Sequence, residues 1–271
     1  MTNDAVRDMI LTARMQAELA HAAYHSVDGV EAMAERYGTR WKVYRANHLE
    51  AAALFFSDHV HLVVCGTNDQ YDWAINTSSS IQQLGICEVH KGFSDAAMWL
   101  AERLFSEGFA AYAHGRRLYL GGHSAGGAIA EMLPLTSRRL IPEATFTFGA
   151  PKWCESQSAP KYRMQPWAKH RFVMAYDPVP FLPLTLWRRV FGLRFFTHVT
   201  KAYQLTNEGI KETDTLEKIE RAQSMARETI TGTVANVIGI SQLFYDIFSF
   251  PAHRSKGYFD ALQSIAREYR V

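Results

Sequence analysis

Ser124 is the residue of this sequence best suited to carry out chemistry. It lies in the pentapeptide Gly-His-Ser-Ala-Gly at residues 122–126, after a short apolar run at 118–120 and before an alanine-rich stretch with helical spacing. A Gly-x-Ser-x-Gly motif between a strand and a helix is typical of the sharp turn that presents a nucleophilic serine. The glycines remove side chains that would clash where the chain reverses. The sequence therefore predicts a serine hydrolase with Ser124 as nucleophile.

A serine nucleophile needs an acid and a base, and after such a turn the expected chain order is serine, then aspartate or glutamate, then histidine. Among the aspartates beyond Ser124, Asp177 directly follows an apolar strand-like segment at 172–176, and Pro178 fixes a turn behind it. The carboxyl ends of strands are where α/β sheets carry their functional residues. We therefore expect Asp177 to be the acid.

Three histidines follow the serine in the sequence: His170, His198 and His253. His170 precedes Asp177 and so falls outside the expected order. His198 lies in a strand-like segment, where a half-buried histidine is the common outcome, whereas His253 lies in a loop before a predicted helix. Catalytic residues are disproportionately found on loops. The residues alone thus favour His253 as general base and leave His198 as the alternative.

Two backbone donors are needed to stabilise the oxyanion that forms during acyl transfer. The N–H of Ala125, directly after the nucleophile, is expected to be one of them. The other comes from a loop at the end of an earlier strand. Thr67 follows the apolar run 59–65 and Gly66, so it is the predicted second donor.

The elements that must position these residues alternate between helices and buried strands. An amphipathic helix is predicted from Val6, a hairpin from 51–56 and 59–65, helical spacing from 89 to 107, and strands at 144–148 and 172–176. No repeat and no Gly/Ser-rich or Pro-rich linker divides the chain. The pattern predicts an α/β fold in a single domain spanning 1–271.

Composition excludes several classes of protein. The 271 residues carry 29 Lys and Arg against 27 Asp and Glu, which is not the basic surface of a nucleic-acid binder. The three cysteines are widely spaced, and His59 and His61 lack a third ligand, so neither a disulfide framework nor a metal site is expected. No signal peptide or membrane-spanning segment is readable, which predicts a cytoplasmic protein or one exported without an N-terminal signal.

Several sequence blocks, taken in order, resemble the fungal-type (class 3) lipases. They are Ala-Ala-Tyr at 22–24, Val-Val-Cys-Gly-Thr at 63–67 with Asp-Trp at 72–73, Val-His-Lys-Gly-Phe at 89–93, Gly-His-Ser-Ala-Gly-Gly at 122–127, Phe-Thr-Phe-Gly-Ala-Pro at 146–151, Tyr-Asp-Pro-Val-Pro at 176–180, Thr-His-Val at 197–199, and His253 with Tyr258. The Gly-x-Ser-x-Gly block is shared by many hydrolases, whereas the other blocks in this order are far more specific.

This resemblance implies an α/β-hydrolase fold with a mostly parallel central sheet and helices on both faces. It also implies cofactor-free hydrolysis of acylglycerols or related lipid esters through an acyl-enzyme intermediate. The triad would be Ser124, Asp177 and His253, with Thr67 and Ala125 at the oxyanion and His198 at a non-catalytic position. The partner would be a lipid ester, met through transient contact with a lipid surface.

The sequence departs from the family at Cys65, where an arginine is usual. The apolar stretches 178–196 and 230–250 flank the proposed acid and base, and they are expected either to line an acyl pocket, to meet a lipid surface or to belong to the core. Two alternative functions remain at this point. One is a phospholipase A that uses Arg188, Arg189 and Arg194 for phosphate, and the other is a catalytically silent binding protein.

Overall fold

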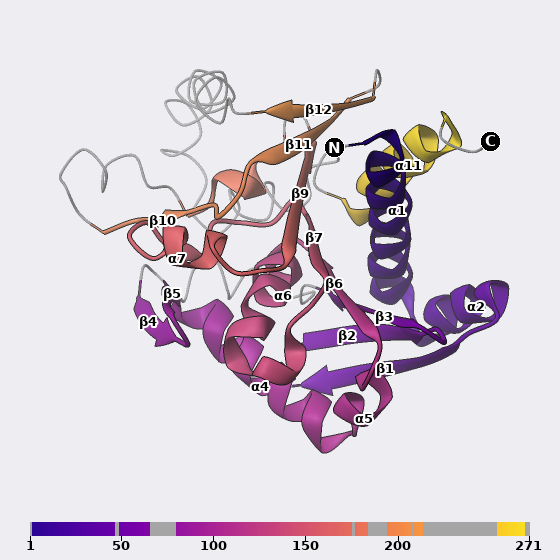
Figure 1. Ribbon diagram of the computed structural model, residues 1–271, viewed down its shortest axis with the longest axis horizontal. Coiled ribbons are helices and arrows are strands. Elements are labelled where there is room, and N and C mark those ends of the chain that lie inside the picture. Colours follow the sequence, from indigo (N-terminus) through magenta and orange to yellow (C-terminus); the bar gives the residue numbers. More distant parts are fainter. Residues whose placement is uncertain are drawn as a thin grey trace, which may run out of the picture.

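The computed structural model describes residues 2–46, 49–65, 80–174, 177–183, 194–206, 209–213 and 254–268. Its centre is an eight-stranded sheet in the order β1-β2-β3-β6-β7-β9-β11-β12 (Figure 1). The strands are β1 (Arg40–Ala46), β2 (Leu49–Phe55), β3 (His59–Cys65), β6 (Arg117–His123), β7 (Ala144–Phe148), β9 (Ala168–Met174), β11 (Ala202–Thr206) and β12 (Gly209–Thr213). From β3 to β11 every neighbouring pair is parallel, and antiparallel strands form both edges. The predicted mostly parallel sheet is therefore confirmed.

The hairpin predicted on the amino-terminal side of the sheet is present as β2 and β3. The two strands pair in antiparallel register from Glu50 with Cys65 to Phe55 with Val60. At the turn, the backbone N–H of Phe56 donates to the carbonyl of His59 at 2.9 Å. The edge strand β1 was not predicted, because the alternation of polar and apolar types ends at Val43, and only Tyr44 and Ala46 of its seven residues are buried.

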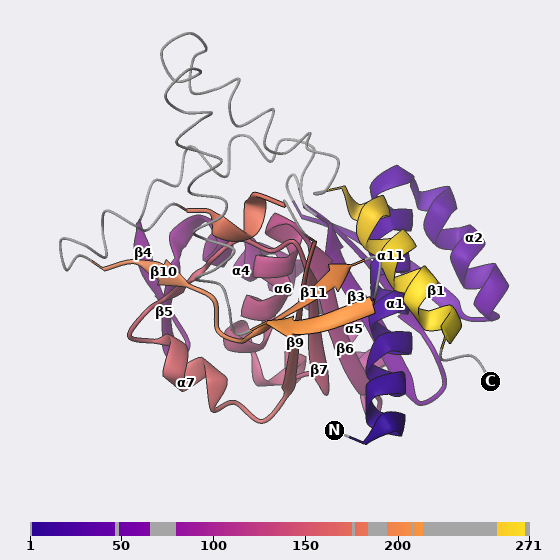
Figure 2. The same ribbon diagram turned by 90° about the horizontal axis from the view of Figure 1, so that it is seen from above.

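Helices cover both faces of the sheet (Figures 1 and 2). On one face lie α1 (Asn3–His25), α2 (Val27–Tyr37) and α11 (Ser255–Glu268), and on the other lie α4 (Lys91–Ser106), α5 (Phe109–Ala113) and α6 (Ala125–Thr136). The first and last described helices, α1 and α11, lie side by side although they come from opposite ends of the chain (Figure 2). The apolar face predicted for the first helix is buried from Met9 to Ala20.

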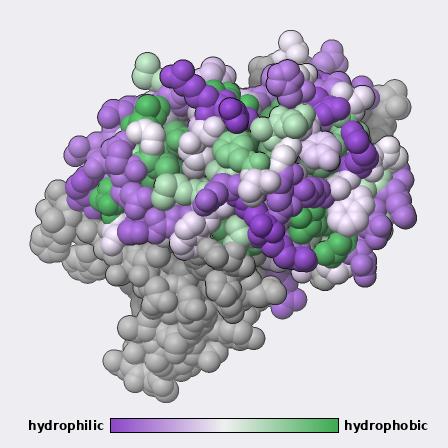
Figure 3. Space-filling model, turned by 90° about the horizontal axis from the view of Figure 1, so that it is seen from below, coloured by the Kyte–Doolittle hydropathy of each residue, from purple (hydrophilic) through white to green (hydrophobic). Residues whose placement is uncertain are grey.

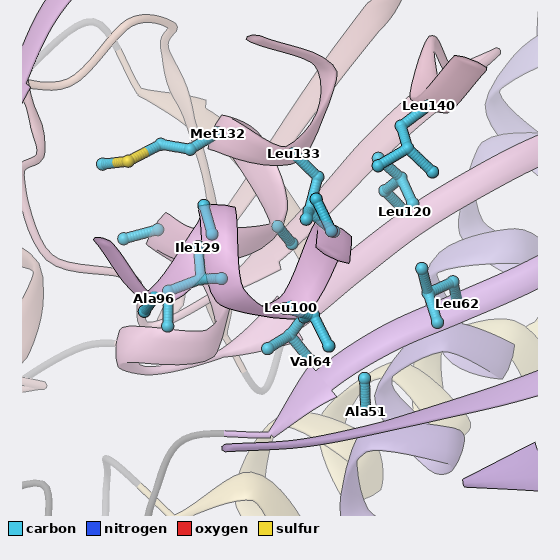
Figure 4. Close-up of a cluster of buried hydrophobic side chains, with 14 of the residues drawn as sticks. Ala51, Leu62, Val64, Ala96, Leu100, Leu120, Ile129, Met132, Leu133 and Leu140 are labelled. Carbon is cyan, nitrogen blue, oxygen red and sulfur yellow. The ribbon is translucent and has the colours of Figure 1, made fainter. Parts of the chain in front are cut away.

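Strand β3 shows how one sequence supplies two cores. Val60, Leu62 and Val64 face the core beneath α4 and α6, while Val63 and Cys65 face α1 and α2. This alternation is the two-residue period of a strand that is buried on both faces. Figure 4 shows the first core, to which β2, β3, β6, α4, α6 and the turn at 138–140 contribute. Its labelled side chains are Ala51, Leu62, Val64, Ala96, Leu100, Leu120, Ile129, Met132, Leu133 and Leu140.

This core fixes the position of α6, and hence of the serine that precedes it. Ile129, Met132 and Leu133 of α6 are at most 1% exposed. Truncating a buried leucine, isoleucine or methionine to alanine typically costs about 2–5 kcal/mol, so displacement of the helix is energetically costly.

A second, smaller sheet has the order β10-β8-β5-β4. It consists of β4 (Ile81–Leu84), β5 (Cys87–His90), β8 (Cys154–Glu155) and β10 (Phe196–Thr197), and the short helices η1 (Arg138–Leu140), α7 (Ala159–Arg163) and η2 (Val179–Phe181) complete the described elements. The helix predicted from residue 89 begins instead at Lys91. That part of the prediction was wrong because Cys87 to His90 pair with β4 in a hairpin, and a local helical period cannot register this pairing.

Among the residues that the structure describes, no helix is long and apolar enough to span a membrane. Of the two apolar stretches, 178–196 and 230–250, the second and residues 184–193 of the first lie outside the described residues. The described start of the first stretch belongs to the core, since Val179, Phe181 and Leu182 are buried.

Candidate active site

Ser124 occupies the sharp turn that was predicted between a strand and a helix. Strand β6 ends at His123 and helix α6 begins at Ala125. Ser124 has φ 56° and ψ −134°, and in the described part of the chain it is the only residue other than glycine with a positive φ. Its backbone N–H donates to the carbonyl of Phe148 at 2.9 Å. Such a conformation is strained for a residue with a side chain, and it is typical of functional sites.

The glycines of the motif are required by close backbone approaches. A Cβ on Gly126 would lie 2.1 Å from the carbonyl oxygen of Val64, and one on Gly122 would lie 2.4 Å from the carbonyl oxygen of Gly126. Both distances are far below van der Waals contact. The turn therefore packs directly against the end of β3, and only glycine fits at either position.

The hydroxyl of Ser124 is buried and makes no hydrogen bond to any other described residue. The backbone carbonyl of Ser124 accepts from the N–H of Gly127 at 2.9 Å, and this bond closes the first turn of α6. The N–H of Ala125 belongs to the first helical residue, which is next to the nucleophile. A helix N-terminus carries a partial positive charge, so negative charge that develops beside Ser124 is favoured there.

Asp177 lies beyond the carboxyl end of β9, two strands from β6 in the sheet. It is 1% exposed. Its Oδ1 accepts from the backbone N–H of Val179 at 2.9 Å, and its Oδ2 accepts from the hydroxyl of Tyr258 at 2.6 Å. Buried carboxylates persist in proteins when hydrogen bonds of this kind replace their hydration. Each carboxylate oxygen is therefore held by at least one donor.

Tyr258 connects Asp177, the candidate acid, to the sharp turn that carries Ser124. It lies in the first turn of α11, and its hydroxyl also accepts from the backbone N–H of Met174 at 3.0 Å. Its ring packs near those of His123 and Phe148, with centroid distances of 5.8 and 6.1 Å. Burial, and then the neighbouring Asp177 charge, raise the pKa of Tyr258 well above its usual value. The phenol consequently stays protonated and acts as a donor.

Sequence reasoning named Tyr258 but gave it no role. Eighty-one positions separate it from Asp177, and no local pattern announces their contact. The only signal in the sequence was its position shortly after His253, in a block that resembles the family.

Two of the three histidines considered as the base are described, and both are engaged or buried elsewhere. His198 Nε2 donates to the carbonyl of Pro180 at 2.6 Å. Burial, followed by the charges of Arg171 and Lys152, lowers the pKa of His198 well below its usual value. His170 lies within β9, and burial lowers its pKa to about 4. Neither imidazole is arranged to accept a proton near neutral pH.

Thr67 and His253, the predicted second oxyanion donor and general base, lie outside the described residues. Their described neighbours are close to the site. Cys65, two positions before Thr67, has its carbonyl carbon 2.9 Å from where a Cβ on Gly126 would lie. Helix α11, which holds Tyr258, begins at Ser255, two positions after His253.

The histidines weighed as metal ligands have protein partners. His59 Nδ1 lies 2.7 Å from Asp58 Oδ1, and His61 Nδ1 lies 3.1 Å from the side-chain amide of Gln16. Burial lowers the pKa of His61 to about 3. Across the described ranges, no three His, Cys, Asp or Glu side chains are arranged to hold a metal ion.

Comparison with known proteins places this geometry in a family. The profile of the lipase (class 3) family matches residues 61–187, a stretch that contains both Ser124 and Asp177. These residues of the chain are similar to the class 3 lipases. A class 3 lipase is a carboxylic ester hydrolase, and lipid esters are its substrates. No curated protein matches the chain by sequence.

Solved structures of fungal lipases share the fold of this chain. The chain superimposes on a triacylglyceride lipase from Rhizomucor miehei with a TM-score of 0.62 and 17% identity, covering 81% of this chain and 91% of that one. A lipase from Rhizopus microsporus var. chinensis gives 0.60 and 16%, with coverages of 80% and 84%. Lipase II from Rhizopus niveus gives 0.58 and 18%, with coverages of 80% and 91%. The predicted α/β-hydrolase fold is confirmed.

The departure from the class 3 lipase pattern at Cys65 has a structural counterpart in this chain. The thiol is buried against α1, with its sulfur 4.0 Å from the carbonyl oxygen of Ala20, and burial raises its pKa. An uncharged side chain therefore fills the position where the family usually has arginine, and here it belongs to the core under α1 and α2.

Proposed function

We propose that this class 3 lipase hydrolyses acylglycerols through a triad of Ser124, Asp177 and His253. The observation that carries the proposal is the strained turn at Ser124, which holds an unbonded hydroxyl at the N-terminus of α6, together with a buried carboxylate fixed beyond β9, two strands away in the sheet. A hydroxyl presented in this way and an acid at the same edge of the sheet are the arrangement that acyl transfer requires.

The reaction proceeds in two halves. His253 takes the proton from the Ser124 hydroxyl as the oxygen attacks the ester carbonyl, and the N–H groups of Ala125 and Thr67 stabilise the resulting oxyanion. Collapse of this intermediate breaks the ester bond and leaves the acyl group on Ser124, while His253 gives its proton to the departing alcohol. Water, deprotonated by His253, then attacks the acyl-enzyme and releases the fatty acid. Asp177 holds the imidazole and stabilises its positive charge throughout.

Two observations support His253 as the base. The other two histidines beyond Ser124 are buried, with lowered pKa values, and His198 already donates to Pro180. Tyr258, five positions after His253, contacts both Asp177 and His123. The short separation of His253 and Tyr258 in the sequence supports a role for both at the same site.

Thr67 as the second oxyanion donor is supported by the path of β3. The strand ends at Cys65, beside Gly126, in the first turn of α6. The end of β3 therefore lies next to the first turn of α6, which supports a donor from the residues that follow it in the sequence. A donor from this loop and one from the helix N-terminus are what an oxyanion hole in this fold uses.

The substrate class rests on the family, and acylglycerols in particular on a relative. The Rhizomucor miehei protein that shares the fold is a triacylglyceride lipase. We propose the same ester class here, with transient contact at a lipid surface. The phospholipase alternative gains no support, because Arg194 pairs with Glu88 and lies 3.8 Å from Glu155, which leaves its charge compensated. Arg188 and Arg189 lie outside the described residues.

A catalytically silent protein is also disfavoured. A fold used only for binding has no need of a strained, unbonded serine opposite a hydrogen-bonded carboxylate, since backbone strain costs about 1–3 kcal/mol. We expect this strained conformation to persist only where the Ser124 hydroxyl takes part in a reaction.

The test is hydrolysis of p-nitrophenyl esters from acetate to palmitate by the wild type and by Ser124→Ala. Ser106→Ala serves as the matched control, because that hydroxyl is exposed on α4 and bonds only to the carbonyl of Arg103. We expect a rate that rises with chain length, is lost in Ser124→Ala and is unchanged in Ser106→Ala. A folded Ser124→Ala protein that retains turnover would refute the assignment. A maximum at acetate would refute the lipid substrate.

A further inference from the structure

A groove lies at the end of the sheet away from Ser124. It is formed between α5, the start of β6 and η1, and has a volume of about 710 Å³, within the size range of small-molecule sites. Apolar and cationic side chains line it together, among them Ala110, Ala113, Leu118, Ile141, Arg116 and Arg139. Figure 3 views the molecule from the side of α5, where hydrophobic residues are interspersed with hydrophilic ones. The groove thus combines apolar walls with positive charge.

The two guanidinium groups are available to a ligand to different degrees. Arg116 donates Nε to the carbonyl of Ser57 at 3.2 Å and Nη1 to the carbonyl of Tyr112, so its orientation is fixed while Nη2 remains free of described partners. Arg139 is anchored through its backbone N–H, which donates to Ser137 Oγ at 3.2 Å. Its side chain makes no hydrogen bond or ion pair with any described residue.

The carboxylates on the surrounding elements form ion pairs with cationic side chains other than Arg116 and Arg139. Asp58 pairs with Arg117 and His59, and Glu107 pairs with Lys42 and Arg103. Glu143 and Asp58 both act on Arg117, raising its pKa. In the described chain, neither arginine of the groove has an acidic partner. Two like charges beside one concave surface repel each other, and an anion between them removes this repulsion.

The apolar walls restrict what kind of anion fits. Ile141 is 45% exposed, although it is a large hydrophobic residue, and the alanines of α5 continue the apolar surface, while Leu118 also lines the groove but is only 5% exposed. Inorganic phosphate would use the arginines and leave these walls in water. A carboxylate on an alkyl chain uses both, because guanidinium binds carboxylate through paired hydrogen bonds and the chain covers the apolar side chains.

We propose that this groove binds a long-chain fatty acid, with its carboxylate at Arg116 and Arg139 and its chain along Ile141 and the alanines of α5. The site is separate from the catalytic one, since the seven residues of β6 lie between them and span roughly 20 Å. If the proposed ester hydrolysis holds, the ligand is of the same class as its acid product. Binding here does not require that reaction, and it is expected equally in the Ser124→Ala protein.

The experiment is photolabelling of the full chain with a diazirine-bearing hexadecanoic acid, followed by mapping of the labelled peptides. Label is expected within residues 110–118 or 139–141, in the wild type and in Ser124→Ala alike. Arg139→Gln should reduce this labelling about tenfold, because a charge-assisted hydrogen bond is lost. That variant removes no contact between described side chains. Arg138→Gln, next to it but not lining the groove, should label as the wild type does.

Competition identifies the ligand chemistry. Dodecanoate should displace the probe from these peptides, whereas dodecanol should do so about tenfold less well and phosphate should not compete at matched concentration. Labelling that is unchanged in Arg139→Gln would overturn the proposal. Equal competition by dodecanol would show that the carboxylate is not recognised, and effective competition by phosphate would show that the alkyl chain is not. Each of these readouts is independent of esterase activity.

Discussion

The hydroxyl of Tyr258 donates a 2.6 Å hydrogen bond to the carboxylate of Asp177. This bond joins the acid of the candidate triad to the helix that follows the proposed base, and the same hydroxyl accepts from the backbone at the end of β9. Tyr258 is therefore a positioning residue, because it acts on the reaction through Asp177.

Tyr258→Phe is expected to lower kcat about tenfold, since the loss of one hydrogen bond to a charged group costs about 1.5–3 kcal/mol. Because Tyr258 acts through Asp177 and not on the substrate, kcat should fall while KM stays unchanged. A purely structural role would lower the free energy of unfolding without this split between kcat and KM. Tyr119→Phe is the matched control, because its hydroxyl has only a 3.3 Å contact with Arg117. An unchanged kcat for a folded Tyr258→Phe protein would contradict the positioning role.

His253→Ala and His198→Asn are expected to separate catalysis from stability. Removal of the base should lower kcat by a factor of about 10⁴ with little change in Tm. His198→Asn should instead lower the free energy of unfolding by about 1–3 kcal/mol, because the buried carbonyl of Pro180 loses its donor, while kcat is largely retained. Kinetics and thermal unfolding of both variants provide the check. The reverse pattern would make His198 the base.

Gly126→Ala is expected to destabilise the fold by about 1–3 kcal/mol or more, because the added methyl group would meet the carbonyl oxygen of Val64 at 2.1 Å. Gly38→Ala is a useful comparison. Gly38 has φ 62° but nothing within 4 Å of an added Cβ, so only the backbone strain of about 1 kcal/mol applies. Denaturant midpoints measure both variants. Equal losses would mean that the turn at Ser124 does not depend on contact with β3.

Glu131, buried in α6, should make stability depend on pH. Burial raises its pKa to about 7, against an ordinary value of 4.5, although the indole N–H of Trp153 donates to one of its oxygens. A raised carboxyl pKa contributes stability that is fully present below about pH 4.5 and is lost as pH rises through about 7. A pKa difference of this size between the folded and unfolded states corresponds to about 3 kcal/mol in the free energy of unfolding.

Glu131→Gln removes this titration. Between pH 5 and pH 8 the wild type should lose about 2 kcal/mol of its free energy of unfolding through Glu131, and the variant should not, so the variant gains this amount relative to the wild type. Denaturant titrations at the two pH values measure the difference, with the exposed Glu102→Gln as a control that shows no such trend. A difference independent of pH would mean that Glu131 is ionised across the whole range.

Local patterns in the sequence determined much of this protein. Residues adjacent in the chain specify the strand, turn and helix around Ser124, and the alternation of apolar residues specifies β2 and β3. Asp177 was found in the same way, from the strand that ends before it and the proline that follows. Such features depend on periodicity and turn geometry, which are written within a few neighbouring residues.

Only the tertiary structure decided the contacts between distant segments. The approach of Val64 to Gly126, the hydrogen bond from Tyr258 to Asp177 and the pairing that turns Cys87 to His90 into a strand each join parts of the chain with no shared local pattern. The groove beside Arg116 and Arg139 likewise exists only because α5 and η1 meet at the start of β6. The physical reason is that local propensity acts over a few residues, whereas packing and hydrogen bonding between elements depend on how the whole sheet assembles.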